Sequence, residues 1–139
     1  DSYKHIAKGN GFKLLSYEGE KFQEIIPDFL SRGEDNRIVA DTKYIPLDGT
    51  KNLSADRASA IYYKTIMYMY RFNSNKGLLL YPSSENCTSY PIEFRIVDTN
   101  GSLVKIPMKI STQKVFGEFA EDMKHNEKEF LIAIKKIKA

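Results

Sequence analysis

The chain has 139 residues, of which 42% are hydrophobic, and it contains nine Tyr and eight Phe. This composition supports one folded domain with a hydrophobic core and argues against a disordered chain. The 21 basic residues outnumber the 18 acidic ones, and the resulting net charge of +3 permits nucleic-acid binding without indicating it.

The N-terminal third predicts two strands joined by a polar turn. Residues 1–19 contain the turn-like sequences GNG and YEGE and predict a loop with one short helix or strand. Residues 21–30 predict a strand that Pro27 interrupts, because proline cannot donate a hydrogen bond inside a sheet. The polar run at 32–36 predicts a turn, and residues 37–44 predict the second strand.

A central helix is predicted over residues 53–72. Ser54 suits its N-cap, Asp56 suits its first turn, and no glycine or proline follows before Gly77. Its apolar residues fall into two stripes, so we expect the helix to be buried between layers on most of its sides. The stripes are Tyr62, Thr65, Met69 and Phe72, and Tyr63, Ile66 and Tyr70.

The C-terminal half predicts three further strands and a second helix. Residues 77–81 are a continuous apolar run typical of an interior strand, and 92–97 and 103–110 flank an Asn-Gly pair that predicts a hairpin. The last helix is predicted over 112–137, interrupted or kinked near Gly117 and near His125-Asn126. The order β-β-α-β-β-β-α predicts an α/β fold in which a mixed β-sheet is flanked by helices.

The predicted strand pair over residues 25–45 brings charged residues together. Side chains two apart share a strand face, so Asp41 and Lys43 point the same way, and burying them is costly unless they are paired or hold a metal. The short turn brings Asp28 close to Asp41. Two nearby carboxylates that both stay ionised call for a divalent cation, Mg²⁺ or Mn²⁺. The residues expected on the opposite, core-facing side are Ile38, Ala40 and Thr42.

Such a site has a definite chemistry. A metal there polarises a phosphodiester and lowers the pKa of a bound water, while the ammonium of Lys43 steadies the attacking water or the developing charge. The backbone carbonyl of Thr42 is a further predicted ligand. The alternative is a surface strand with an ordinary Asp–Lys pair, because Asp-X-Lys arises often by chance.

Pro27-Asp28 followed by Asp41-Thr42-Lys43 resembles the motif of the PD-(D/E)XK nuclease superfamily. More narrowly, ADTKY followed by a helix and then GLLLYP is similar to the nuclease subunit of McrBC-type modification-dependent restriction systems and its uncharacterised relatives. The resemblance covers residues 25–82 and implies a restriction-endonuclease-like core. It implies that Asp28 and Asp41 bind metal and that Lys43 is the catalytic lysine.

The chain departs from this family pattern in two places. The helix of such nucleases often carries a Gln four residues before a Tyr, whereas Lys64 stands before Tyr68 here. We expect Lys64, Tyr68 and Arg71 to contact DNA, with Arg57 near the same stripe and a solvated basic edge as the alternative. Related nucleases also place another acid before the Pro-Asp strand. The nearest substitutes are Glu18, Glu20 and Glu24, and none is singled out.

We therefore expect residues 1–139 to form a single nuclease domain. Because the chain begins at Asp1 rather than Met, we also expect it to be the C-terminal fragment of a longer protein. The expected function is metal-dependent hydrolysis of DNA phosphodiester bonds in a bacterial or archaeal restriction system that defends against phage. The alternatives are an inactive nuclease-fold module for binding or assembly, and a repair or transposition nuclease of the same fold.

The expected partners are DNA and an NTPase or specificity subunit, with a homodimer left open. The single cysteine, Cys87, cannot form an internal disulfide, which fits a reducing compartment. Neither a signal peptide nor a membrane span is visible, because the apolar runs are only a few residues long. We therefore expect a cytoplasmic protein.

Overall fold

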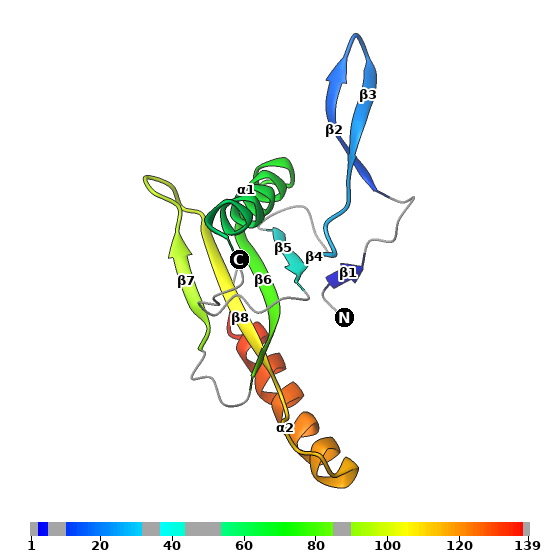
Figure 1. The fold of residues 1–139 in the computed structure, drawn as a ribbon. Coiled ribbons are helices and arrows are strands. Elements are labelled where there is room, and N and C mark those ends of the chain that lie inside the picture. The colour runs from blue at the N-terminus through cyan, green and yellow to red at the C-terminus, as the bar shows by residue number, and fades with distance from the viewer. Residues whose placement is uncertain (1–2, 6–10, 32–36, 44–53, 85–89, 138–139) are drawn as a thin grey trace.

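The computed structural model describes residues 3–5, 11–31, 37–43, 54–84 and 90–137 (Figure 1). The turn predicted at 32–36 and Cys87 lie outside these residues. The elements are β1 Tyr3–His5, β2 Phe12–Tyr17, β3 Glu20–Ile25, β4 Phe29–Ser31, β5 Arg37–Thr42, α1 Ala55–Arg71, β6 Ser74–Ser84, β7 Ile92–Arg95, β8 Ser102–Ile110 and α2 Phe116–Lys135.

Six strands form one mixed sheet in the order β1-β4-β5-β6-β8-β7. The three inner strands β5, β6 and β8 run parallel, and β4, β1 and β7 are added antiparallel. Strands β2 and β3 form a separate two-stranded hairpin, which projects away from the sheet (Figure 1). The predicted α/β class and mixed sheet are thus confirmed, and β4 and β5 are the predicted strand pair at residues 25–45.

The two helices cover opposite faces of the sheet. Side chains that alternate along β5 point to the two faces in turn, and each set packs against a different helix. Val39 packs with Tyr68 and Met69 of α1, whereas Ile38 and Ala40 pack in a second cluster, against α2. The α2 side of that second cluster is Phe130, Ala133, Ile134 and the following residue Ile137. No helix among the described residues is long and apolar enough to cross a membrane.

The single strand predicted over 21–30 is wrong, since the structure divides it between two sheets. Residues up to Ile25 pair with β2, and the chain resumes pairing only at Phe29, this time with β5. Pro27 explains the division, because it removes a backbone donor and fixes its own φ. The break releases Asp28 from both ladders and leaves its side chain beside the end of β5.

The central helix also differs from its prediction on one side. Ser54 caps α1 as expected, its hydroxyl accepting the backbone N–H of Arg57 at 3.2 Å. Tyr63 and Tyr70, however, are 70% and 91% exposed, so α1 covers one face of the sheet and is not buried on most sides. Local sequence shows which positions are apolar, but it does not show how many layers pack on them.

The predicted interruption of the last helix near His125-Asn126 is wrong as well. Helix α2 runs without a break from Phe116 to Lys135, and Gly117 lies in its first turn. Asn126 is buried within the helix. Contact of α2 with β8, together with the apolar residues that follow Asn126, holds this poor helix former in helical conformation.

Gly77 gives a direct test of the packing between α1 and the sheet. A Cβ at this position would meet Met69 Sδ at 2.8 Å, Thr65 Cγ2 at 2.9 Å and Leu103 Cδ2 at 3.0 Å. We expect Gly77→Ala to lower the free energy of unfolding by about 1–3 kcal/mol, as overpacking does. Urea unfolding followed by circular dichroism measures the change.

Gly117→Ala is the matched control for this substitution. A Cβ there meets nothing within 4 Å, and alanine favours helix over glycine by about 1 kcal/mol. We expect this variant to be as stable as the wild type or slightly more stable. Equal loss of stability in both variants would contradict the close contact at Gly77.

Candidate functional site

The charged residues of β5 lie at the carboxyl end of the strand, beside the parallel strand β6. Ligand sites of α/β sheets commonly form outside the carboxyl ends of parallel strands. Asp41 and Thr42 are the last residues of β5, and the backbone N–H of Lys43 donates to the carbonyl of Leu80 on β6 at 2.8 Å. This bond extends the ladder by one residue and holds Lys43 at the edge of the sheet.

Two hydrogen bonds from Thr42 hold Asp28 against this strand end. Its Oδ2 accepts the backbone N–H of Thr42 at 2.7 Å and the Thr42 hydroxyl at 2.6 Å. Burial disfavours the charged form, but the hydrogen bonds from Thr42, followed by a hydrogen bond with Asp41 and the charge of Lys43, together hold the pKa of Asp28 below its usual value. Asp28 is therefore a stable carboxylate in the folded protein.

Asp41 has the opposite tendency. It is only 4% exposed, and burial raises the pKa of its carboxyl group, although the hydrogen bond and charge of Lys43 oppose the rise. The negative charge of Asp28 raises the pKa of Asp41 further. Lys43 Nζ forms an ion pair with Asp41 Oδ2, so the predicted common orientation of these two side chains is confirmed.

Helix α1 covers this pair with an aromatic ring and a second cation. Tyr68 is 2% exposed, and its hydroxyl donates to the carbonyl of Ile26 at 3.3 Å. Burial, and then the charge of Asp41, raises the pKa of Tyr68 to about 12, so this hydroxyl keeps its proton. Lys64 Nζ lies 5.6 Å from the centre of the Tyr68 ring, and its charge favours ionised Asp41.

The three residues expected to contact DNA are thus placed differently. Lys64 is exposed beside the acids, Tyr68 is buried, and the Nε of exposed Arg71 donates to the carbonyl of Lys13 at 2.8 Å. Their contact with DNA stays a prediction, and the geometry favours Lys64 most. Sequence reasoning missed the tie between α1 and the segment before Asp28, since a side chain bonding to a distant backbone carbonyl leaves no local pattern.

The donor set fits a divalent cation, with Asp28 and Asp41 as the carboxylate ligands. Burial raises the pKa of Asp41 most and the negative charge of Asp28 raises it further, and a dication bound to both acids would favour their ionised forms. Across the described part of the chain, no three His, Cys, Asp or Glu side chains come together as a metal group. The additional acid is therefore not found there, and Glu24 forms an ion pair with Lys13 at 3.8 Å.

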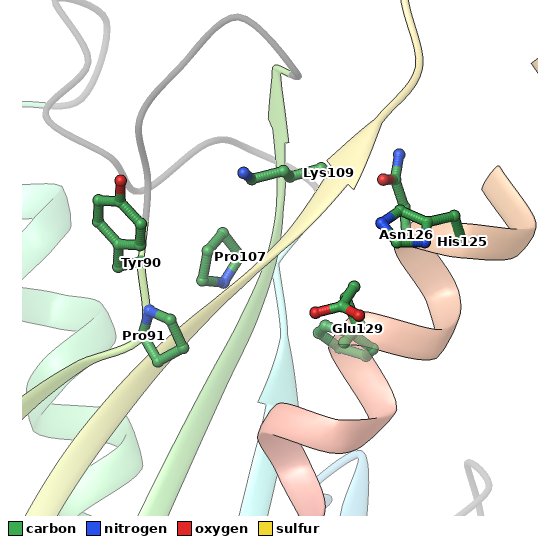
Figure 2. A pocket seen from close by; sticks show the side chains of 8 residues that line it. Tyr90, Pro91, Pro107, Lys109, His125, Asn126 and Glu129 are labelled. Atoms are coloured by element: carbon green, nitrogen blue, oxygen red, sulfur yellow. The ribbon is translucent and has the colours of Figure 1, made fainter. Parts of the chain in front are cut away.

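Two hollows lie near this end of the sheet. An apolar groove of about 440 Å³ borders Thr42 and Lys43 and is lined mainly by β6, β8 and Phe130. Figure 2 shows the second, of about 340 Å³, which is lined by His125, Asn126 and Glu129 of α2 and by Lys109 of β8, among other residues. His125 is exposed, and Glu129 is the one acid among the described residues that line this hollow. These residues therefore do not form a paired-carboxylate centre.

Comparison with known proteins places the chain in a family. A family model described as the McrBC 5-methylcytosine restriction system component matches residues 2–82, which is more than half of the chain. The matched segment contains Asp28, Asp41, Lys43 and all of α1. No curated protein matches the chain.

One similar solved structure is a half-complex from a tetradecameric assembly of Thermococcus gammatolerans McrB AAA+ hexamers with bound McrC. The TM-score is 0.48 at 16% sequence identity, and the match covers 91% of this chain and 28% of that chain. The present chain thus spans less than a third of the length of the chain that it matches.

The pKa of Asp28 predicts a pH dependence of stability. Because its folded pKa lies below 3.8, Asp28 stabilises the fold above pH 3.8, and this contribution is lost as the pH falls through the folded pKa. We expect Asp28→Asn to be less stable than wild type at neutral pH, with the difference shrinking as the pH falls below 3.8. Urea unfolding at a series of pH values measures it.

Glu127→Gln, which removes one exposed carboxylate from α2, is the control for loss of charge alone. A difference between Asp28→Asn and wild type that stays constant from neutral to strongly acidic pH would contradict the role of the Thr42 hydrogen bonds.

Proposed function

The chain belongs to the McrBC 5-methylcytosine restriction system component family, and from this premise we propose that it is a magnesium-dependent DNA endonuclease domain of a restriction system. The observation that supports the proposal most is the placement of Asp28 and Asp41 on neighbouring chain segments, with Lys43 paired to Asp41. The resemblance of the sequence to the PD-(D/E)XK motif, in which such acids bind metal and such a lysine is catalytic, adds support to the proposal. The proposed fold is accordingly a restriction-endonuclease-like core.

Each residue has a role in the proposed hydrolysis. Asp28 and Asp41 hold Mg²⁺ or Mn²⁺, with the backbone carbonyl of Thr42 as a further oxygen ligand. The ion, when bound, supplies Lewis acidity at the phosphodiester. Lys43, oriented by Asp41, would supply an ammonium group that stabilises the developing negative charge. Lys64 supplies a second positive charge for the DNA backbone.

The proposal also covers the larger protein and the partners with which the domain acts. The chain acts as a single nuclease domain, the C-terminal fragment of a longer cytoplasmic protein, and target recognition resides in another domain or in an NTPase or specificity subunit. The described residues support this division, because the sheet and its two helices account for most of them and leave little for reading bases. A homodimer is the alternative assembly.

The rival function is a nuclease-fold module that binds or assembles without cleaving. The ion pair between Lys43 and Asp41 is consistent with this rival, because the pair neutralises both charges without a metal. A repair or transposition nuclease of the same fold is a second rival, against which membership of a restriction-system family argues.

Cleavage of methylated and unmethylated plasmid DNA with Mg²⁺ tests the proposal on the full natural protein with its partners. We expect Asp41→Ala and Lys43→Ala each to reduce the cleavage rate about a hundredfold or more, since both act on the developing charge. Glu93→Ala and Lys76→Ala are matched controls, because these residues form a separate ion pair at 2.7 Å. They should cleave at the wild-type rate.

The proposal fails if the intact protein with its partners cuts neither plasmid and Asp41→Ala binds Mn²⁺ as well as wild type. An intact protein that neither cleaves DNA nor binds Mn²⁺ would instead favour the assembly module. Activity that survives Asp41→Ala while Glu93→Ala abolishes it would place the catalytic centre elsewhere.

Lys64 is tested separately by binding to DNA. We expect Lys64→Ala to weaken binding regardless of sequence and to lower the slope of log affinity against log salt by about 1. Fluorescence anisotropy over a salt series, in Ca²⁺ to prevent cleavage, measures both effects. Lys124→Ala, which removes an exposed lysine of α2, is the control. An unchanged salt slope in Lys64→Ala would contradict a phosphate contact.

A further inference from the structure

We propose that the hydroxyl group of Thr42 is a positioning element that fixes which oxygen of Asp28 faces the metal ion. The inference rests on the proposed function, and it concerns a side chain to which the sequence assigned only a backbone role. Thr42 is the middle residue of Asp41-Thr42-Lys43, where the family motif allows any residue.

The geometry singles out one oxygen atom of Asp28. Both donors of Thr42, its backbone N–H at 2.7 Å and its hydroxyl at 2.6 Å, bond to Oδ2. The two bonds approach one oxygen from different atoms, so they restrict rotation of the carboxylate about its last torsion. Oδ1 is left as the oxygen that Thr42 does not bind, so it is the oxygen that would bind the cation.

The position of Asp28 in the chain makes this restraint necessary. Asp28 lies between β3 and β4, in the break that Pro27 creates, so no sheet ladder holds its backbone. Pro27 is fully buried and fixes its own φ, but it does not control the side chain of the next residue. The backbone of Thr42, by contrast, is anchored in β5, which pairs with β6 up to Leu80.

The two donors contribute differently to the site. The backbone N–H of Thr42 is present whatever side chain occupies the position, so one bond to Oδ2 survives any substitution except proline. The hydroxyl bond is specific to threonine or serine. A carboxylate held by one bond pivots about it, whereas one held by two bonds keeps a single orientation. Residues that orient metal ligands in this way commonly change metal affinity about 10- to 100-fold when they are removed.

The test is metal binding by the full natural protein without DNA, measured by isothermal titration calorimetry with Mn²⁺. Thr42→Val keeps the shape of the side chain and removes the hydroxyl, and we expect it to bind Mn²⁺ about tenfold more weakly. Thr42→Ser restores the hydroxyl and should bind within about twofold of wild type. Thr42→Ala is measured as well, so that the result does not depend on whether valine is tolerated.

Thr65→Val is the matched control. Thr65 is fully buried in α1, and its hydroxyl donates to the carbonyl of Ile61 at 3.0 Å, so this variant loses a hydroxyl without touching Asp28. It should bind Mn²⁺ as the wild type does. Thermal unfolding of each variant without metal separates an effect on the ion site from an effect on the fold.

The outcomes separate this inference from the proposed function. If wild type binds Mn²⁺ and Thr42→Val and Thr42→Ala bind it equally well, the positioning role is overturned and the proposed nuclease is untouched. If Thr42→Ser binds as weakly as Thr42→Val, the hydroxyl is not the determinant and the inference also fails. If wild type binds no Mn²⁺, both fail together. Weak binding in Thr42→Val and Thr42→Ala with rescue in Thr42→Ser supports the inference.

Discussion

The burial of one carboxylate, that of Asp41, is the constraint on which the rest of the site depends. An ionised group inside a sheet is costly unless opposite charge and hydrogen bonds compensate it. The compensation comes from two cations, Lys43 directly after the same strand and Lys64 on helix α1, whereas the negative charge of Asp28 opposes the ionisation of Asp41. Asp41 thus occupies a buried position where an apolar residue would avoid the cost of burying a charge.

The surroundings of the neighbouring acid, Asp28, shift its pKa in the opposite direction. Asp28 takes hydrogen bonds from Thr42 and remains ionised, whereas Asp41 is buried and resists ionisation. Two carboxyl groups whose surroundings push their pKa values apart are typical of functional sites, and ordinary surface ion pairs do not produce this contrast. The site therefore differs physically from the pair of Lys76 and Glu93, whose acid is exposed.

The parts of this arrangement that local sequence encodes were predictable. Alternation along β5 gave the faces of Asp41 and Lys43, and Ser54 marked the start of α1 correctly. The pairing partners of residues 21–30 were not predictable, because a broken strand can rejoin either sheet without changing its local pattern. The exposure of Tyr63 and Tyr70 and the continuity of α2 likewise depend on which surfaces pack together. The hydrogen bond from the Thr42 hydroxyl to Asp28 was not predictable from local sequence, because Asp28 lies fourteen positions away in the chain.

The contact at Gly77 has a consequence for electrostatics. With no side chain on β6 at this point, Thr65 and Met69 of α1 rest almost directly on the strand backbone. The same helix carries Lys64, whose charge acts on Asp41 in the sheet below. A side chain at Gly77 that pushed α1 away from the sheet would increase the distance between Lys64 and Asp41, and the effect of that charge on the buried acid would weaken.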